Sequence, residues 1–318
     1  MSAPVVSVVL PVYNGDRFLE ESLQSILRQS FTDLELIVIN DGSTDGTREI
    51  LERYCDRDPR LRVWHQENRG LSRSLNVGLE LARGRYLARQ DADDVSLPER
   101  IAKQVAFLDA HPDYCMVGTW SHIIEEQRHS LRFHRHPAEN GPLKFNLLFD
   151  NFFVHTSVMV RKSALDAVGA YTTAQVRQPE DYELWSRLLR GRLGKMANLP
   201  EVLVEYREVE GSICRSDSRS FTDQVMAISR LNLAAFSGRE PEDQLVADLS
   251  ALVHGVFDQV STRPDFAAIF MLLRRTARGV IGEAEATPMG EVYRLFFALV
   301  KGYVRYRLRN LRCLRLDR

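Results

Sequence analysis

The sequence predicts an α/β protein in which helices flank a mostly parallel β-sheet, followed by a helical C-terminal extension. Residues 5–10 form an almost continuous run of apolar, β-branched residues, as in strands buried on both faces of a parallel sheet. Strand-like and helix-like patterns then alternate through the first hundred residues, which is typical of successive βαβ units. From about Asp217 onward, long helical periodicities replace them.

The individual elements follow from these patterns. After the first strand, a turn at Pro11 leads into a helix that has Leu19, Leu23 and Ile26 on one face. The remaining strands are expected at residues 34–39, 61–65, 85–88, 116–119, 152–155 and 157–160. Helices are expected to end near residues 55 and 82, to cover 97–108, and to begin again near 180.

Polar turns follow three of the predicted strands, at residues 11–14, 40–45 and 91–94. Ligands of open parallel sheets bind beyond the carboxyl ends of the strands. We therefore expect the three turns to converge on one crevice, where Tyr13 offers a flat face for a base and Asp41 an acceptor for a base N–H. Both residues also have a structural explanation, Tyr13 as a packing aromatic and Asp41 as a turn former.

Three carboxylates, Asp91, Asp93 and Asp94, lie within four residues of each other in the third turn. Like charges this close repel each other, so a cation bound between them would stabilise the arrangement. Mn²⁺ and Mg²⁺ prefer oxygen ligands, and Mg²⁺ commonly takes one or two carboxylates together with a substrate's phosphates. The alternative is an acidic turn in which Asp93 or Asp94 caps the helix that begins near residue 97.

Two common nucleotide-binding motifs are absent. The turn after the first strand is Pro-Val-Tyr-Asn-Gly, which lacks the Gly-x-Gly-x-x-Gly of dinucleotide-binding proteins, and no Walker A loop occurs. A nucleotidyltransferase would share the sheet architecture, but it usually has a glycine-rich loop with basic residues at this turn. That loop is also missing.

Composition sets broader limits. The chain has 318 residues, of which 44% are hydrophobic and 27% charged, as in an ordinary globular protein. Its net charge of −1 argues against nucleic acid as the main partner. The four cysteines are far apart, which favours reduced thiols over a disulfide frame or a zinc site. No apolar stretch approaches the roughly 20 residues that span a bilayer, and we expect a cytoplasmic protein.

The middle of the chain holds further candidates. His134 and His136 could bind a metal, but no acid or cysteine stands at ligand spacing, which favours an exposed hairpin. His155 is either a core histidine or an auxiliary catalytic group. Glu180 and Asp181 open a predicted helix, where they complement the helix dipole or, in the case of Asp181, supply a general base.

Four motifs, in this order, resemble those of family 2 glycosyltransferases with the GT-A fold. They are Val-Ser-Val-Val-Leu-Pro-Val-Tyr-Asn from Val6, Asn-Asp-Gly-Ser-Thr-Asp from Asn40, Asp-Ala-Asp-Asp from Asp91, and Glu-Asp-Tyr-Glu-Leu-Trp from Glu180. The resemblance covers about residues 5–210, and the segment 88–108 is similar to bacterial members that build surface polysaccharides. It implies a Rossmann-like sheet with a nucleotide-sugar-binding half at 1–115, an acceptor-binding half at 116–215 and a helical extension at 216–318.

The resemblance also implies an activity. The enzyme would be an inverting, metal-dependent glycosyltransferase that moves a sugar from a nucleotide-diphosphate sugar, with UDP the expected nucleotide, to a hydroxyl of a saccharide or lipid-linked saccharide in polysaccharide biosynthesis. Asp93 and Asp91 would ligate Mn²⁺ or Mg²⁺, Asp181 would be the catalytic base, and Glu180 and His155 would be auxiliary. The nucleoside pocket would be lined by Pro11, Val12, Tyr13, Asn14, Asp41 and Asp91.

One position departs from the family pattern. Many members have a histidine after the Tyr-Arg that follows the acceptor helix, whereas Tyr206-Arg207 is followed here by Glu208-Val209-Glu210. A histidine contact to metal or phosphate is therefore in doubt, and Glu208 or Glu210 could substitute for it. The alternative to an enzyme is a catalytically silent nucleotide-sugar-binding or membrane-scaffold protein, against which the intact Asp93 and Asp181 argue.

Residues 290–318 predict a basic amphipathic helix. They contain eight Arg or Lys and two acids, a net charge of +6 in a chain whose total is −1. Such a helix either lies on the inner face of the cytoplasmic membrane as a peripheral contact, or packs on the protein itself or in a homodimer. Its apolar face would consist of Val292, Leu295, Phe296, Leu299, Tyr303 and Tyr306.

Overall fold

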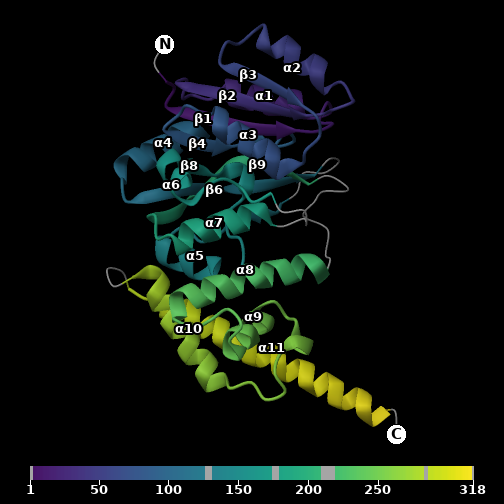
Figure 1. Ribbon diagram of the computed structural model, residues 1–318, viewed down its shortest axis with the longest axis vertical. Helices are drawn as coiled ribbons and strands as arrows, with labels where there is room; N and C mark the ends of the chain where they lie inside the picture. The colour runs from purple at the N-terminus through teal and green to yellow at the C-terminus, as the bar shows by residue number, and fades with distance from the viewer. Residues whose placement is uncertain (1–2, 126–130, 174–178, 209–218, 283–285, 317–318) are drawn as a thin grey trace. The chain divides into compact units, whose positions relative to one another are not determined.

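The computed structural model describes residues 3–125, 131–173, 179–208, 219–282 and 286–316 (Figure 1). Side chains are described as far as residue 309. The chain divides into two compact units whose segments alternate along the sequence. Unit 1 comprises residues 1–139, 152–176 and 191–216, and unit 2 comprises residues 140–151, 177–190 and 217–318.

The N-terminal half of unit 1 alternates strands and helices as predicted. Strands β3, β2, β1 and β4 are neighbours in this order and run parallel. Every residue of β1 and β2 is buried, which explains their apolar runs. The elements are β1 (Val6–Val12), α1 (Leu19–Leu27), β2 (Leu34–Asp41), α2 (Thr47–Cys55), β3 (Leu61–Gln66), α3 (Leu71–Leu81), β4 (Tyr86–Arg89) and α4 (Arg100–Ala110).

Helices cover both faces of this parallel half. Val6, Val8 and Leu10 of β1 share a hydrophobic core with side chains of α1, α2 and α4. Val9 points to the opposite face, because successive residues of a strand alternate between faces. There it meets α3 at Gly78, where an added Cβ would lie 2.3 Å from Val9 Cγ1. The absence of a side chain at Gly78 therefore lets α3 approach the sheet.

The other half of the sheet mixes strand directions. Beyond β4 come β8, β6, β9 and β5, and β7 pairs with β6. Strands β6 and β9 are parallel, whereas β8 runs antiparallel to β4 and β6, and β5 runs antiparallel to β9. The elements are β5 (Val95–Ser96), β6 (Tyr114–Glu125), β7 (Phe133–His134), β8 (Met159–Arg161), α6 (Lys162–Val168) and β9 (Lys195–Glu208).

The strand predicted at residues 152–155 is wrong. Residues 152–154 lie outside any strand, and the 3₁₀ helix η1 (His155–Ser157) follows them. Polar groups of η1 make tertiary hydrogen bonds instead of strand pairs: Thr156 Oγ1 accepts from the Asp91 N–H at 3.0 Å, and Ser157 Oγ accepts from the Thr119 N–H at 3.2 Å. Thr156 therefore connects this segment to the turn that carries Asp91, Asp93 and Asp94, here called the aspartate turn.

An ionic network around the buried Glu35 joins β1, β2, β3 and the segment before β4. Glu35 accepts hydrogen bonds from Ser7 Oγ at 2.7 Å, Arg62 Nη1 at 2.8 Å and Arg83 Nη2 at 2.6 Å. Burial opposes ionisation of Glu35, but these hydrogen bonds outweigh it and lower its pKa to about 2. The carboxylate therefore contributes stability at pH values above its ordinary pKa of 4.5, and this stability is lost as the pH falls toward 2.

We expect Glu35→Gln to lower the free energy of unfolding by about 2 kcal/mol at pH 7, because Arg62 and Arg83 lose their charged partner. Urea unfolding measures the loss, which should shrink as the pH falls from 4.5 toward 2. Glu20→Gln is the matched control, since Glu20 pairs with Arg53 at the surface, where ion pairs contribute little. Equal losses in both variants, or a loss that does not depend on pH, would contradict the prediction.

The described residues of unit 2 form helices and the turns between them, without strands. Asn232 of α8 is buried and ties this helix to α7, because its Nδ2 donates to Ser186 Oγ at 2.9 Å and its Oδ1 accepts from Arg190 Nη1 at 2.6 Å. Nowhere in the described chain is a helix long and apolar enough to cross a membrane. The helices are α5 (Asn140–Leu147), α7 (Glu180–Arg190), α8 (Arg219–Ser237), α9 (Gln244–Val253), η3 (Phe257–Gln259), α10 (Phe266–Ile281) and α11 (Met289–Leu316).

The apolar face predicted for the last helix packs inside unit 2. Val292, Leu299 and Tyr303 of α11 are buried. Phe296 lies against Phe266 and Phe270 of α10, with ring centroids 6.4 Å and 5.0 Å apart. This face is therefore an internal contact and is not available to a membrane.

Candidate functional site

The three polar turns meet at one edge of the sheet in unit 1, as predicted. Asn14 joins the first two turns, because its Oδ1 accepts from the Thr44 N–H at 2.8 Å and its own N–H donates to Ser43 Oγ at 2.9 Å. Gly15 brings in the third, since a Cβ built on it would lie 3.7 Å from the Ala92 Cβ. The order β2-β1-β4 in the sheet places the turn after β1 between the other two.

The candidate nucleoside residues differ in exposure. Pro11 and Val12 are buried in β1, whereas Tyr13 is 54% exposed, so its ring is not part of the core. Asp41 is buried and accepts three hydrogen bonds, from Gln66 Nε2 at 2.7 Å and from the N–H groups of Arg69 at 2.9 Å and Gly70 at 2.8 Å. A carboxylate has about four acceptor positions, so one remains for a ligand N–H.

The three aspartates of the third turn have different partners. Asp91 pairs with Arg89 Nη2 at 2.6 Å. Asp94 is buried, and its Oδ1 accepts from the backbone N–H of Arg207 in β9 at 2.7 Å. The alternative interpretation of the turn, in which Asp94 caps α4, is therefore wrong. Glu99 occupies the N-cap position of that helix.

Asp93 is the aspartate of this turn whose carboxylate has no side-chain partner among the described residues. No side chain in the described part of the protein donates a hydrogen bond to its carboxylate or pairs with it. Burial and the neighbouring Asp91 carboxylate raise the pKa of Asp93 to about 6. The site therefore has a negative potential that an added cation would relieve.

Two arginines behind this turn were not predicted from the sequence as site residues. Arg207 Nε donates to the Asp93 carbonyl at 2.9 Å, its Nη2 pairs with Glu21 at 2.7 Å, and its guanidinium lies over the Phe18 ring. Arg207 and Asp93 are 114 positions apart, so no local sequence signal connects them. Arg89, which pairs with Asp91, is buried at the end of β4.

Arg100 is the third arginine near the aspartates, and its side chain is fully buried. Its Nη1 donates to Ser96 Oγ at 2.7 Å and Gln90 Oε1 at 3.0 Å, and its Nη2 donates to the Arg89 carbonyl at 2.7 Å. Burial lowers the pKa of Arg100 to about 9, opposed chiefly by Asp94, so it stays charged at neutral pH. Its positive charge therefore partly offsets the carboxylates of the aspartate turn.

Three histidines of unit 1, His134, His136 and His155, make structural contacts. His134 lies in β7, which pairs with β6 as expected, and His136 follows this strand; their rings are stacked 5.8 Å apart. Both side chains are part-buried, so this hairpin is not exposed at the two histidines as predicted. Burial lowers the pKa of both, to about 4 for His136. His155 in η1 contacts Tyr171 Oη at 3.0 Å and also has a lowered pKa because of burial. It adjoins Thr156, which binds the aspartate turn.

Glu180 and Asp181 begin α7, as predicted, and belong to unit 2. Asp181 Oδ2 accepts from Asn151 Nδ2 at 2.6 Å, and its Oδ1 accepts from the Tyr182 N–H at 2.6 Å. Burial and the adjacent Glu180 carboxylate raise the pKa of Asp181 to about 7. Within the described residues it has no ion-pair partner, so it can gain and lose a proton near neutral pH.

The aspartate turn fits a metal that is shared with a substrate. Among the described residues, no three His, Cys, Asp or Glu side chains form a complete metal site. Mg²⁺ and Mn²⁺ at nucleotide sites need only one or two carboxylates, since phosphate oxygens and water supply the other ligands. Asp93, whose carboxylate receives no side-chain hydrogen bond within the described residues, and the neighbouring Asp91 provide such a pair.

A mixed sheet with a parallel nucleotide-binding half and an acidic turn at the end of its fourth strand is the architecture of GT-A glycosyltransferases. Residues 7–169 match the model of the family described as glycosyl transferase family 2, and the chain belongs to this family. The protein is a glycosyltransferase, and the predicted fold and family are confirmed.

Curated relatives agree with this assignment. The chain is 38% identical over 227 residues to the putative glycosyltransferase EpsE of Bacillus subtilis, which covers 70% of this chain and 79% of that protein. It is 30% identical over 233 residues to the amylovoran biosynthesis glycosyltransferase AmsE of Erwinia amylovora, covering 72% and 85%. The match to another glycosyltransferase spans 66% of that protein's length.

Solved structures share the fold. TarS residues 1–349 of S. aureus, in complex with UDP-GlcNAc, superposes with a TM-score of 0.64 at 19% identity, covering 94% of this chain and 89% of that one. The mannosyltransferase PcManGT of Pyrobaculum calidifontis, in complex with GDP-Man and Mn²⁺, gives a TM-score of 0.51 at 17% identity, covering 96% and 87%.

Proposed function

We propose that the enzyme is an inverting, metal-dependent glycosyltransferase that uses a nucleotide-diphosphate sugar, with UDP as the nucleotide. The observation that supports the donor site is the meeting of Tyr13, Asp41 and Asp93 at one edge of the parallel sheet. In this proposal Tyr13 stacks on the base, Asp41 accepts a base N–H, and Pro11, Val12 and Asn14 complete the pocket. Residues 1–115 form the donor half and residues 116–215 the acceptor half.

Asp93, with Asp91, would hold Mn²⁺ or Mg²⁺ against the diphosphate. A divalent ion supplies Lewis-acid neutralisation of the charge that develops on a leaving diphosphate. The complex of PcManGT with GDP-Man and Mn²⁺ supports this choice of cofactor. Arg89, which pairs with Asp91, and Arg100 would offset part of the carboxylate charge at this turn.

Asp181 is assigned as the general base. An inverting displacement requires a group that removes the proton of the acceptor hydroxyl on the face opposite the leaving group. Asp181 suits this role because it has a raised pKa and no ion-pair partner in the described chain, and Asn151 fixes its orientation. Glu180 and His155 are auxiliary in this proposal.

The acceptor we propose is a hydroxyl of a saccharide or lipid-linked saccharide, in the synthesis of a polysaccharide on the cytoplasmic side of the membrane. The relative AmsE, named for amylovoran biosynthesis, supports this class of acceptor. The expectation that Glu208 or Glu210 replaces a family histidine is weakened, since Glu208 pairs with Arg132 at 2.6 Å, while Glu210 lies outside the described residues.

The test of the donor site is Asp93→Asn. We expect its affinity for UDP in the presence of Mn²⁺ to fall at least about tenfold by titration calorimetry, because a charged metal ligand is lost. Without metal, UDP should bind the variant as well as or better than the wild type, because one repelling carboxylate is gone. Asp166→Asn, at an exposed Lys162 pair, is the control. Unchanged Mn²⁺-dependent affinity in Asp93→Asn would refute the assignment.

A further inference from the structure

Helix α11 has a second apolar stripe, distinct from the face that packs inside unit 2. Tyr293, Phe297, Val304 and Leu308 are between 47% and 65% exposed. They are spaced by four, seven and four residues, so they follow one face of a helix with 3.6 residues per turn. Four of the large exposed hydrophobic side chains of the described chain therefore form one line, here called the α11 stripe.

Basic side chains flank the α11 stripe. Lys301 and Arg305 are exposed and lie about 40° to 100° around the helix from it, on the side away from the buried face. No carboxylate of the described residues pairs with either of them, and Glu291 is the only acid in the sequence of α11. Arg294, beside Tyr293, pairs with Glu291 at 2.6 Å.

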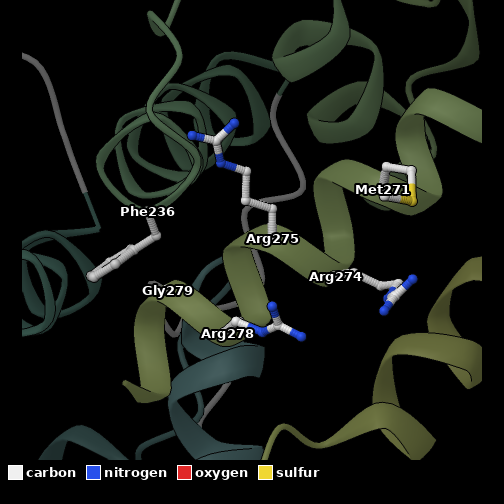
Figure 2. A pocket seen from close by; sticks show the side chains of 6 residues that line it. All are labelled: Phe236, Met271, Arg274, Arg275, Arg278 and Gly279. Carbon is white, nitrogen blue, oxygen red and sulfur yellow. The ribbon is translucent and has the colours of Figure 1, made fainter. Parts of the chain in front are cut away.

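Helix α10 extends this basic border. Arg274 lies 6.0 Å from the Phe270 ring, and that ring lies 5.4 Å from the Tyr293 ring at the start of the stripe. Figure 2 shows Arg274 and Arg278 extending from one side of α10, by a cavity of about 450 Å³. Arg275 lies elsewhere: its Nη2 is 3.0 Å from the position that a Cβ on Gly238 would take. Gly238 follows the C-terminal end of α8, where a cation stabilises the helix dipole.

We propose that the α11 stripe and its basic border, formed by Lys301, Arg305 and Arg274, dock unit 2 on an anionic lipid bilayer. Aromatic and aliphatic side chains would enter the boundary between headgroups and acyl chains, and the arginine and lysine side chains would reach the phosphate layer. The helix would lie in the plane of the surface without crossing it.

Charge decides between a bilayer and a second copy of this chain. The spacing of the α11 stripe would also suit a helix pair. However, the sequence of α11 carries seven Arg or Lys and one acid, so two copies would bring +6 against +6. An anionic lipid surface complements this charge, whereas a second α11 is repelled by it.

The test is flotation of the full chain with vesicles of phosphatidylcholine containing 30% phosphatidylglycerol, compared with phosphatidylcholine alone. We expect binding to the anionic vesicles that weakens as salt rises. Lys301→Glu/Arg305→Glu should bind at least about 30-fold more weakly, and Phe297→Ser/Leu308→Ser about tenfold more weakly. Point substitutions are preferred to truncation because the opposite face of α11 is buried.

Matched control variants distinguish the α11 stripe and its basic border from effects of net charge or of exposed leucines elsewhere. Arg28→Glu/Arg57→Glu changes the net charge equally, and Leu131→Ser/Leu231→Ser removes exposed leucines elsewhere; both should float like the wild type. Failure of the wild type to float, or flotation of the charge variant at the wild-type level, would overturn the proposal. A dimer in sedimentation that Phe297→Ser/Leu308→Ser dissociates, without vesicle binding, would assign the stripe to a second copy instead. Flotation involves no sugar transfer, so its result is independent of the proposed function.

Discussion

Asp181→Asn is expected to lower kcat by about 10²–10⁴-fold while leaving the affinity for UDP unchanged. The amide cannot take the proton of the acceptor hydroxyl, and a loss of this size is the contribution that a general base typically makes to the rate. Asn151 can hydrogen-bond an amide in place of the carboxylate, so the position of the side chain is preserved. Turnover of UDP-sugar donors and calorimetric binding of UDP measure the two quantities separately.

The pH dependence of the wild-type rate tests the same assignment of Asp181 as the general base. Because the pKa of Asp181 is raised to about 7, the rate at saturating substrate should fall as the pH drops below 7 and level off above it. Glu183→Gln, two residues along α7, is the control, since Glu183 pairs with Arg187 at 3.0 Å. A pH-independent rate between 5 and 8, or full turnover by Asp181→Asn, would remove Asp181 from the role.

Asp181→Asn should also make the protein more stable than the wild type at pH 8. A carboxyl group whose pKa is raised by folding favours the folded state when protonated, and it loses that contribution as the pH rises from its ordinary value of 3.8 through 7. Asparagine has no such titration. We expect Asp181→Asn to melt a few degrees above the wild type at pH 8, with the difference vanishing near pH 4.

Arg100→Met is expected to lower the free energy of unfolding by about 3–5 kcal/mol, the largest loss of stability among these predictions. Methionine fills similar volume, but it leaves Ser96 Oγ, Gln90 Oε1 and the Arg89 carbonyl without their donor inside the protein. It also removes a positive charge from beside the aspartate turn. Urea unfolding measures the loss, and Mn²⁺-dependent UDP affinity reports whether the turn has moved.

Two variants keep this prediction testable if Arg100→Met does not fold. Arg100→Lys retains the charge with fewer hydrogen bonds, and it should lie between the wild type and Arg100→Met in stability. Lys103→Met, one turn along α4, removes a partly exposed lysine that pairs with Glu201 and should change stability by less than about 0.5 kcal/mol. Equal stability of the Lys103 and Arg100 methionine variants would show that the buried guanidinium is not needed.

The donor side of the site could be predicted because its residues follow strands. Buried strands give the clearest sequence pattern, and the carboxyl ends of parallel strands share one edge, so Tyr13, Asp41 and Asp93 could be brought together before any coordinates were known. Their converging turns are confirmed, although the roles of the side chains remain predictions.

What the sequence could not reveal were contacts between distant segments. Arg207 meets Asp93 and Asp94 across more than a hundred residues, and nothing in its immediate neighbours marks it as part of the turn. The cap predicted for Asp94 was wrong for the same reason. The sequence pattern offered only the nearby helix start as a partner, whereas Asp94 accepts from the backbone N–H of Arg207. Helix α11 shows a further limit of sequence analysis. Periodicity identified its apolar face, but it did not reveal that this face is buried and that the α11 stripe is exposed.

The alternation of the two units along the chain has a consequence for biosynthesis. The segment that bears Asp181 is translated before α8, yet α7 forms buried hydrogen bonds with Asn232, which leaves the ribosome some fifty residues later. His254 of the same late region also contacts the Phe149 carbonyl, just ahead of Asn151. A nascent chain released near residue 216 would thus contain the proposed donor half but lack Asn232 and His254, which hold α7 and the segment before Asn151. Premature fragments should therefore bind nucleotide without transferring sugar.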